Sequence, residues 1–176
     1  MPAPCSSAAS SAAAWKTASS LPVATVEVPS ALPAGMTAQD AAVLVQSEDA
    51  AGMVWEVAAA RSADDVRQRA ADRAELHRER AQAWAEAAAI AGSGTDPRRS
   101  AYDLPDALTA EVVEPTELWA AVAGVEADLA VAYASLVAVA SADSRDDLMD
   151  AFLECTQTQV AIGMAASTFP GMPELG

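Results

Sequence analysis

The amino-acid sequence predicts an all-α fold, a bundle of four long helices in which two antiparallel hairpins are joined by a long crossover loop. Apolar residues make up 52% of the chain, but alanine supplies much of that share and aromatic residues contribute only 5%. A core of alanine, valine and leucine needs close backbone approach, which favours packed helices over a sheet sandwich. Runs of β-branched and aromatic residues, which are typical of strands, are nearly absent from the sequence.

The first two helices are each predicted from an N-terminal capping signal. In "TAQD", Thr37 precedes an acidic residue by three positions, as in a capping box, and the helix is expected to run to about Ala60. The segment "SADD" repeats this signal at Ser62, so the second helix is expected to run from there to about Ala91, where "GSG" ends it. The short link between the two helices predicts an antiparallel hairpin.

The second half of the chain repeats this plan after a long connection. Residues 92–114 contain turn-forming residues early and a proline later, and they predict a loop that crosses the bundle. Pro115 suits the first turn of a third helix, which is expected over 115–140. The segments "SADS" and "SRDD" mark the start of a fourth helix, expected over about 142–166. Two hairpins with a long central connection form one of the four-helix-bundle topologies.

Three parts are predicted along the chain: a flexible Ala/Ser/Pro-rich tail or linker (1–36), the helical domain (37–166) and a C-terminal tail (167–176). The first part lacks the basic start and apolar core of a signal peptide. However, Cys5 followed by a Ser/Ala-rich linker resembles the start of a mature bacterial lipoprotein, in which that cysteine carries the lipid. Pro4 departs from the small residue that such signals have there. A lipid anchor at Cys5 predicts a cell-envelope location, and a plain disordered tail leaves the cytoplasm as the alternative.

The negative charge of the chain excludes several classes of partner. The net charge is −15, and residues 101–176 hold thirteen acidic residues against Arg145 alone. Such a surface repels the phosphates of nucleic acids and anionic lipids, so we expect no nucleic-acid partner and membrane contact only through a lipid anchor. Eight arginines between residues 61 and 100 alternate with acidic residues and are expected to form i,i+4 pairs on a solvated helix face. The longest apolar segment is interrupted by acidic residues, so we expect no transmembrane helix.

Each predicted helix has an apolar stripe at three- and four-residue spacing that is expected to face the core. Three of these stripes hold one ionisable residue near the middle (Glu48, His77 and Glu126), and Glu154 lies beside the fourth stripe. Buried carboxylates are costly unless they are paired, neutralised or metal-bound. We therefore expect His77 to be a structural residue, hydrogen-bonded to Glu48 or Glu126. Other stripe members are expected to be core anchors or hydrogen-bond donors to a buried carboxylate: Trp55, Trp84, Tyr133 and Cys155.

This layout resembles the ferritin-like di-iron bundles, which place one glutamate on each of two helices and a Glu-x-x-His motif on each of the other two. Glu48 and Glu126 match the single glutamates, and His77 matches the histidine of one motif. The resemblance implies six ligands, two of which are replaced in this chain. Ala74 stands three residues before His77, and in "ECTQ", which begins at Glu154, glutamine stands where the second histidine belongs.

The C-terminal half also resembles an uncharacterised ferritin-like family of high-GC Gram-positive bacteria. The matching features are "YDLP" in the crossover loop, Glu126 seven residues before Tyr133, and an arginine at the start of the last helix. The resemblance covers about residues 38–165. It implies a ferritin-like bundle, a protein that is often exported or lipidated in this family, and no established biochemical function.

From these observations we expect a non-catalytic ferritin-like domain with a degenerate metal site, a structural or interaction role and no cofactor. A basic protein partner suits an acidic bundle face, and self-association into a homo-oligomer stays open. The alternative is an oxidase-like bundle in which Glu48, His77, Glu126 and Glu154 bind iron or manganese, the metals that carboxylate-rich ligands favour. A third hypothesis, a small-molecule carrier, requires a cavity in the core. The sequence has no phosphate-binding loop, nucleophile elbow or Cys-x-x-Cys motif.

Overall fold

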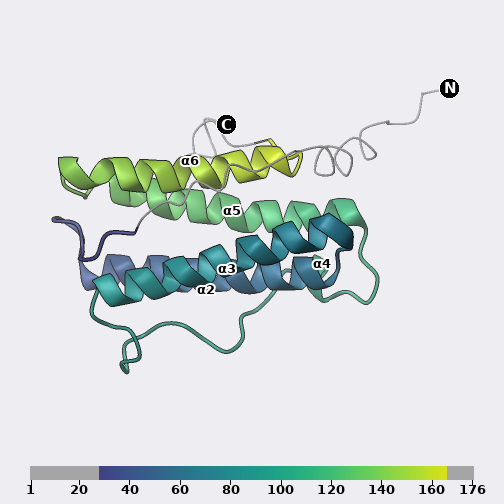
Figure 1. The fold of residues 1–176 in the computed structure, drawn as a ribbon, viewed down its shortest axis with the longest axis horizontal. Coiled ribbons are helices and arrows are strands. Elements are labelled where there is room, and N and C mark those ends of the chain that lie inside the picture. Colours follow the sequence, from purple (N-terminus) through teal and green to yellow (C-terminus); the bar gives the residue numbers. More distant parts are fainter. Residues whose placement is uncertain (1–27, 166–176) are drawn as a thin grey trace.

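The computed structural model describes residues 28–165, and in this part of the chain the regular elements are all helices. The predicted all-α class is therefore confirmed for the described residues. The long helices lie side by side, with a short helix in the crossover segment (Figure 1). The elements are α2 (Ala38–Ala60), α3 (Asp64–Ala87), α4 (Asp106–Thr109), α5 (Pro115–Val137), the 3-10 helix η1 (Ala142–Ser144) and α6 (Arg145–Ala161).

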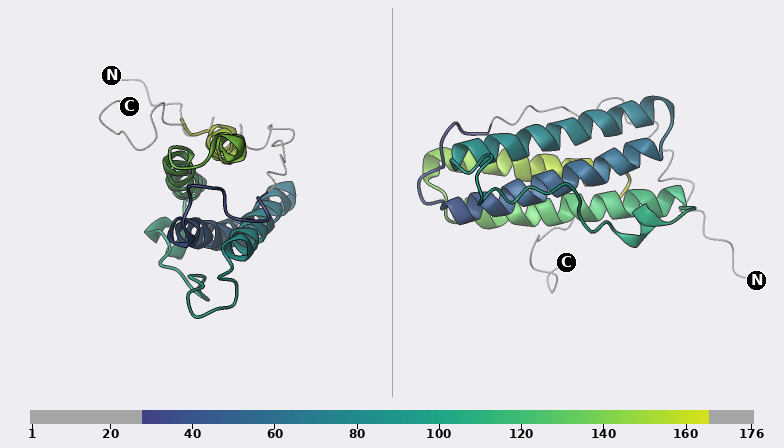
Figure 2. Two further views of the ribbon diagram at one scale, coloured as in Figure 1. Left: turned by 90° about the vertical axis from the view of Figure 1, so that its left-hand side faces the viewer. Right: turned by 90° about the horizontal axis from the view of Figure 1, so that it is seen from below.

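The long helices form two antiparallel hairpins. Residues 61–63 join α2 to α3, and residues 138–144, which include η1, join α5 to α6. Figure 2 places α2 and α3 on one side and α5 and α6 on the other, with the crossover segment outside the first hairpin. The backbone N–H of Ser141 donates to the carbonyl oxygen of Ala34 at 2.8 Å, which holds the start of α2 beside the end of α5. Both apolar clusters of the core contain residues from the two hairpins.

The starts of α2 and α3 are built differently, although their sequences carry the same capping signal. At α2 the capping box is complete, because the Thr37 side chain accepts from the Asp40 N–H and the Asp40 carboxylate accepts from the Thr37 N–H. At α3 the N-cap residue is Ala63, which has no capping side chain. The hydroxyl of Ser62 instead donates to the Ala58 carbonyl oxygen at 2.7 Å, at the end of the preceding helix. The expected start of this helix at Ser62 was therefore two residues too early.

The end of α3 lies at Ala87, earlier than the expected end at Ala91. Ala89 has a φ of 55°, in the left-handed region, and this conformation stops the helix. The N–H of Ile90 then turns back to the carbonyl oxygen of Ala85 at 2.9 Å, and the Ile90 side chain is buried in the core. Such a helix end normally has glycine at the left-handed position, so the "GSG" segment that follows was misread as the stop signal.

Replacing Ala89 with glycine is expected to raise the free energy of unfolding by about 0.5–1 kcal/mol. Glycine removes the clash between Cβ and the backbone that a left-handed alanine suffers, which outweighs its larger entropy in the unfolded chain. Urea unfolding followed by circular dichroism would measure the change. Ala83→Gly is the matched control inside α3 and should lower the unfolding free energy by about 1 kcal/mol. A loss of stability in both variants would contradict the assignment of the helix end.

The core consists of two apolar clusters, and on α3 and α5 a buried polar residue lies between members of the two clusters. On α3, for example, Ala74 belongs to one cluster and Trp84 to the other, with His77 between them. The predicted stripe on α2 is fully buried at Leu44, Glu48, Ala51, Trp55 and Ala58. An interior that is apolar toward both ends and polar in the middle is the feature that positions the candidate site.

The ends of the predicted helical domain differ from the expectation where the structure describes them. Residues 28–36, assigned to the flexible tail, include the buried Met36, and Val28 and Leu32 also pack against the core. The last helix ends at Ala161 and not near residue 166. Residues 1–27 and 166–176 lie outside the described residues, and so does the predicted lipid anchor at Cys5.

Helix α5 is long and apolar enough to cross a membrane by length and composition alone. In the structure, however, it carries the fully buried carboxylate of Glu126 and packs against both α2 and α6. A core helix of an alanine-rich bundle has the same composition, so this feature gives only weak evidence for a membrane span.

Candidate functional site

The four residues predicted as candidate metal ligands come from four different helices and are all buried, with at most 3% of each residue exposed. His77 on α3 lies between two of the glutamates. Its Nδ1 is 2.6 Å from Oε2 of Glu48 on α2, and its Nε2 is 3.1 Å from Oε1 of Glu126 on α5. Glu154 on α6 is linked to this group through an arginine side chain. The residues that the sequence singled out therefore belong to one connected network.

Two arginines of α3 belong to this network, and the prediction that they lie on a solvated helix face was wrong. Arg73 donates from Nε and Nη2 to the two oxygens of Glu126, each at 3.2 Å, and from Nη1 to Glu154. Arg80 donates from Nη2 to the other oxygen of Glu154. Only 6% of Arg73 and 2% of Arg80 are exposed. These ion pairs join α3 to α6 across the core.

A signal for these arginines was present in the sequence. Arg73, His77 and Arg80 are separated by four and then three residues, so they share one face of α3. They were missed because the acidic residues around them offered i,i+4 partners on the surface. Arg80 and Glu154 are 74 positions apart, so no pattern of neighbouring residues in the sequence indicates that they pair.

Aromatic side chains donate the remaining hydrogen bonds to the buried carboxylates. Tyr133 donates its hydroxyl to Oε1 of Glu48. The indole Nε1 of Trp84 donates to the Tyr133 oxygen at 3.3 Å, and the Nε1 of Trp55 donates to Oε1 of Glu126 at 2.9 Å. These contacts give the indole N–H groups of Trp55 and Trp84 partners inside the protein, as buried polar groups require.

The geometry around His77 favours the doubly protonated ring. Burial lowers the pKa of His77, but the carboxylate of Glu126 and that of Glu48 outweigh burial and the positive charge of Arg73, so the pKa lies above its usual value. Burial alone would raise the pKa of Glu126, yet the charges of Arg73 and His77 hold it well below the usual range. With His77 protonated, three carboxylates face three cations, and the buried network is electrically balanced.

The same geometry bears on whether these residues suit a bound metal. The guanidinium of Arg73 bonds to both Glu126 and Glu154, so a cation already bridges the two carboxylates. Both nitrogens of His77 face carboxylate oxygens, which leaves neither of them directed at an open position. Within residues 28–165, no group of three or more His, Cys, Asp or Glu side chains is arranged to hold a metal ion. The donor set therefore fits a di-metal centre poorly.

A second polar cluster fixes the crossover segment to the first hairpin. The carboxylate of Asp49 accepts from the hydroxyl of Tyr102 at 2.7 Å, from the backbone N–H of Arg99 at 3.3 Å and from Nη1 of Arg78 at 2.5 Å. A Cβ at Gly52 would lie 2.9 Å from Cδ of Arg78, so glycine gives this arginine room to reach Asp49. Burial, and then the Asp49 carboxylate, raise the pKa of Tyr102 to about 12.

Replacing Tyr102 with phenylalanine is expected to lower the free energy of unfolding by about 1–2 kcal/mol. The change removes the hydroxyl that donates to Oδ2 of Asp49. The same oxygen also accepts from the backbone N–H of Arg99, at the longer distance of 3.3 Å. Hydrogen exchange of the backbone amides in residues 96–104 should also become faster. Arg99→Ala is the control, since it keeps the backbone N–H that bonds to Asp49. An equal effect of the two substitutions would show that the hydroxyl contact is unimportant.

Most of the chain matches a known protein family. A family model described as Domain of unknown function (DUF4439) matches residues 38–174. No curated protein and no solved structure matches the chain. The matched range begins at the first residue of α2, contains every residue of the buried network and continues past the end of α6.

Proposed function

We propose that this chain, which belongs to the family Domain of unknown function (DUF4439), is a ferritin-like four-helix bundle without catalytic activity and with a structural or interaction role. In this proposal, arginine side chains take the place that metal ions have in ferritin-like carboxylate proteins. The network is a stabilising element of the core, and the function of the protein lies on its surface.

The positions of the network residues support the ferritin-like assignment. A single buried glutamate lies on each of α2 and α5, while α3 and α6 contribute His77 and Glu154. This is the distribution over four helices that the ferritin-like pattern has. The departures from the pattern support the loss of metal binding. Ala74 fills one ligand position with a methyl group, and Gln157 at another is exposed to solvent.

The observation that carries the proposal is the contact of Arg73 with both Glu126 and Glu154. Placing a divalent metal between these two glutamates would require this guanidinium to leave a position that is 6% exposed. A displaced arginine would then lack its carboxylate partners, and a buried unpaired charge is strongly unfavourable. Competition between Arg73 and a metal ion therefore favours the arginine.

Elemental analysis of the protein, purified without an affinity tag from its native host, tests this proposal. We expect iron, manganese and zinc each to be below about a tenth of an equivalent, as adventitious binding to carboxylates would give. Titration of the purified protein with ferrous and manganous ions should show no saturable site. One equivalent of tightly held iron or manganese, lost in Glu126→Gln, would contradict the proposal and support the oxidase-like alternative.

The surface role is proposed for the acidic side of the second hairpin. Asp146, Asp147 and Asp150 are exposed near the start of α6, and a basic protein surface is the partner that this charge suits.

A location at the cell envelope is proposed from Cys5 alone. Mass spectrometry of the N-terminal peptide from the native host should find lipid on Cys5, and an unmodified Cys5 in the soluble fraction would contradict the anchor.

A further inference from the structure

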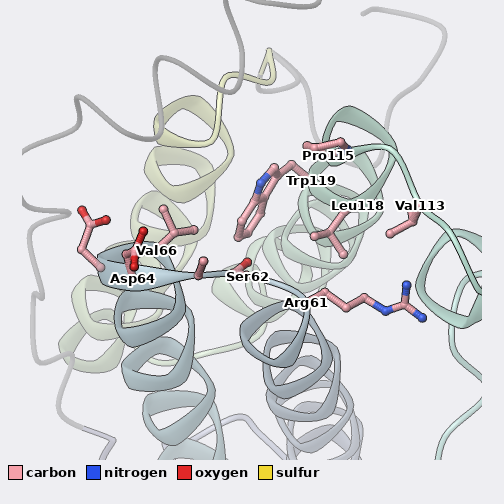
Figure 3. Close-up of a pocket in the computed structure, with 10 residues that line it drawn as sticks. Arg61, Ser62, Asp64, Val66, Val113, Pro115, Leu118 and Trp119 are labelled. Carbon is pink, nitrogen blue, oxygen red and sulfur yellow. The ribbon is translucent and has the colours of Figure 1, made fainter.

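A pocket of about 480 Å³ lies at the end of the bundle where α2 turns into α3 and where α5 begins (Figure 3). Its apolar wall comes from Val66 at the start of α3 and from Val113, Pro115, Leu118 and Trp119 around the start of α5. Figure 3 shows the indole ring of Trp119 between the starts of the two helices. The C-terminal end of α6 lies beside the pocket in the same view.

Three of the four polar side chains around the pocket bond to partners outside it, and the fourth is the carboxylate of Asp64. The guanidinium of Arg61 donates to the carbonyl oxygen of Ala110 at 2.8 Å. The hydroxyl of Ser62 donates to Ala58, and the carboxylate of Asp65 pairs with Arg69. A pocket for a small polar ligand needs polar groups that converge on it, which these do not provide. The lining therefore suits apolar side chains of a peptide segment.

The chain itself brings such a segment to this place. Ile162, directly after α6, is buried in the same apolar cluster as Leu118 and Trp119, so the chain leaves the described part next to the pocket. Phe169 follows Ala165 by four residues, which an extended chain spans in about 13 Å. The match of the family model also continues to residue 174, so this segment belongs to the pattern of the family and not only to this chain.

The sequence of residues 166–176, "ASTFPGMPELG", has the composition that an apolar, aromatic-lined groove binds. Its large apolar residues, Phe169, Met172 and Leu175, recur at every third position, and prolines follow the first two directly. A proline-rich segment favours the polyproline II helix, which has three residues per turn, so these side chains would share one side. Grooves lined by aromatic residues recognise such helices because little conformational entropy is lost on binding.

We propose that the pocket is the docking site of residues 166–176 of the same chain, with the Phe169 ring held against Trp119 and Val66. This inference rests on the pocket and on the family match, and it is independent of the role proposed for the buried network.

A spin label on the C-terminal segment of the full-length chain tests the proposal. The label is attached to Glu174→Cys in a Cys5→Ser background. Cys155 stays unlabelled, because it is buried and burial raises the pKa of its thiol. We expect the indole N–H resonance of Trp119 to lose most of its intensity, while that of Trp84, which lies in the other apolar cluster, is retained. An unchanged Trp119 resonance would overturn the proposal.

Two variants and a mixed sample identify the occupant. Phe169→Ser combined with Met172→Ser should restore the Trp119 resonance, while the matched control Val160→Ser, at an exposed apolar position on α6, should leave it broadened.

In a mixture of spin-labelled chains with separately isotope-labelled chains, the Trp119 resonance should stay sharp. Broadening in that mixture would assign the pocket to a second copy. Broadening by a label on Ser10→Cys, with none from residue 174, would assign it to the N-terminal segment. Either result would overturn the proposal.

Discussion

Replacing Arg73 with alanine is expected to lower the free energy of unfolding by about 3–5 kcal/mol, the range for removing one partner of a buried ion pair. The variant leaves Glu126 without two hydrogen bonds and Glu154 without one, while both carboxylates stay buried. The lost guanidinium also holds the pKa of Glu126 low, so the variant should protonate this carboxyl at a higher pH. Urea unfolding followed by circular dichroism at neutral pH measures the loss.

Arg69→Ala is the matched control for this change. Arg69 lies one turn earlier on α3 and pairs at 3.0 Å with Asp65, whose side chain is 67% exposed. An exposed pair of this kind contributes about 0–1 kcal/mol. A loss in Arg73→Ala no larger than that in Arg69→Ala would contradict the buried network. A second variant, Arg73→Met, keeps much of the side-chain volume and separates the loss of charge from the loss of packing.

The difference between Arg69 and Arg73 also shows what could be predicted from the sequence. Helix periodicity and the capping box at Thr37 were enough to place α2 and to bury Glu48, because both depend on neighbouring residues. The same periodicity placed His77 inside. Arg73 lies on that face too, but a long charged side chain can point to the surface or across the core. Which of the two it does is decided by Glu154, 81 residues away.

The end of α3 was mispredicted for a related reason. Glycine is the usual residue at a left-handed helix end, and the sequence offers a "GSG" segment at the expected place. The helix ends earlier because burying Ile90 in the core outweighs the strain of a left-handed alanine at position 89. Local propensity cannot report a tertiary contact of this kind. For the same reason, the pocket at the start of α5 could not be predicted from local sequence patterns.

Replacing His77 with glutamine is expected to remove a pH-dependent contribution to stability. The pKa of His77 in the folded protein lies above the usual 6.5, so its stabilisation is fully present below about pH 6.5. This contribution decreases as the pH rises through the folded pKa, because the folded protein then loses a proton that the unfolded chain has already lost. His77 is the only histidine in the chain, so no other imidazole titrates in this range. Unfolding free energies of both proteins, measured from pH 5.5 to 8.5, give the difference.

The pH dependence expected for His77 is opposite in sign to that expected for Glu126. Glu126 has a lowered pKa, so its contribution is present above the ordinary carboxyl pKa of 4.5 and is lost on acidification, below the range measured. We expect the parent protein to exceed His77→Gln in stability by about 2–4 kcal/mol near pH 6, where three cations balance three carboxylates, and by less at pH 8.5. A difference that stays constant with pH would mean that His77 acts only through packing and neutral hydrogen bonds. A difference that grows with pH would mean that the folded protein favours the neutral imidazole, and the balanced ion network would then be wrong.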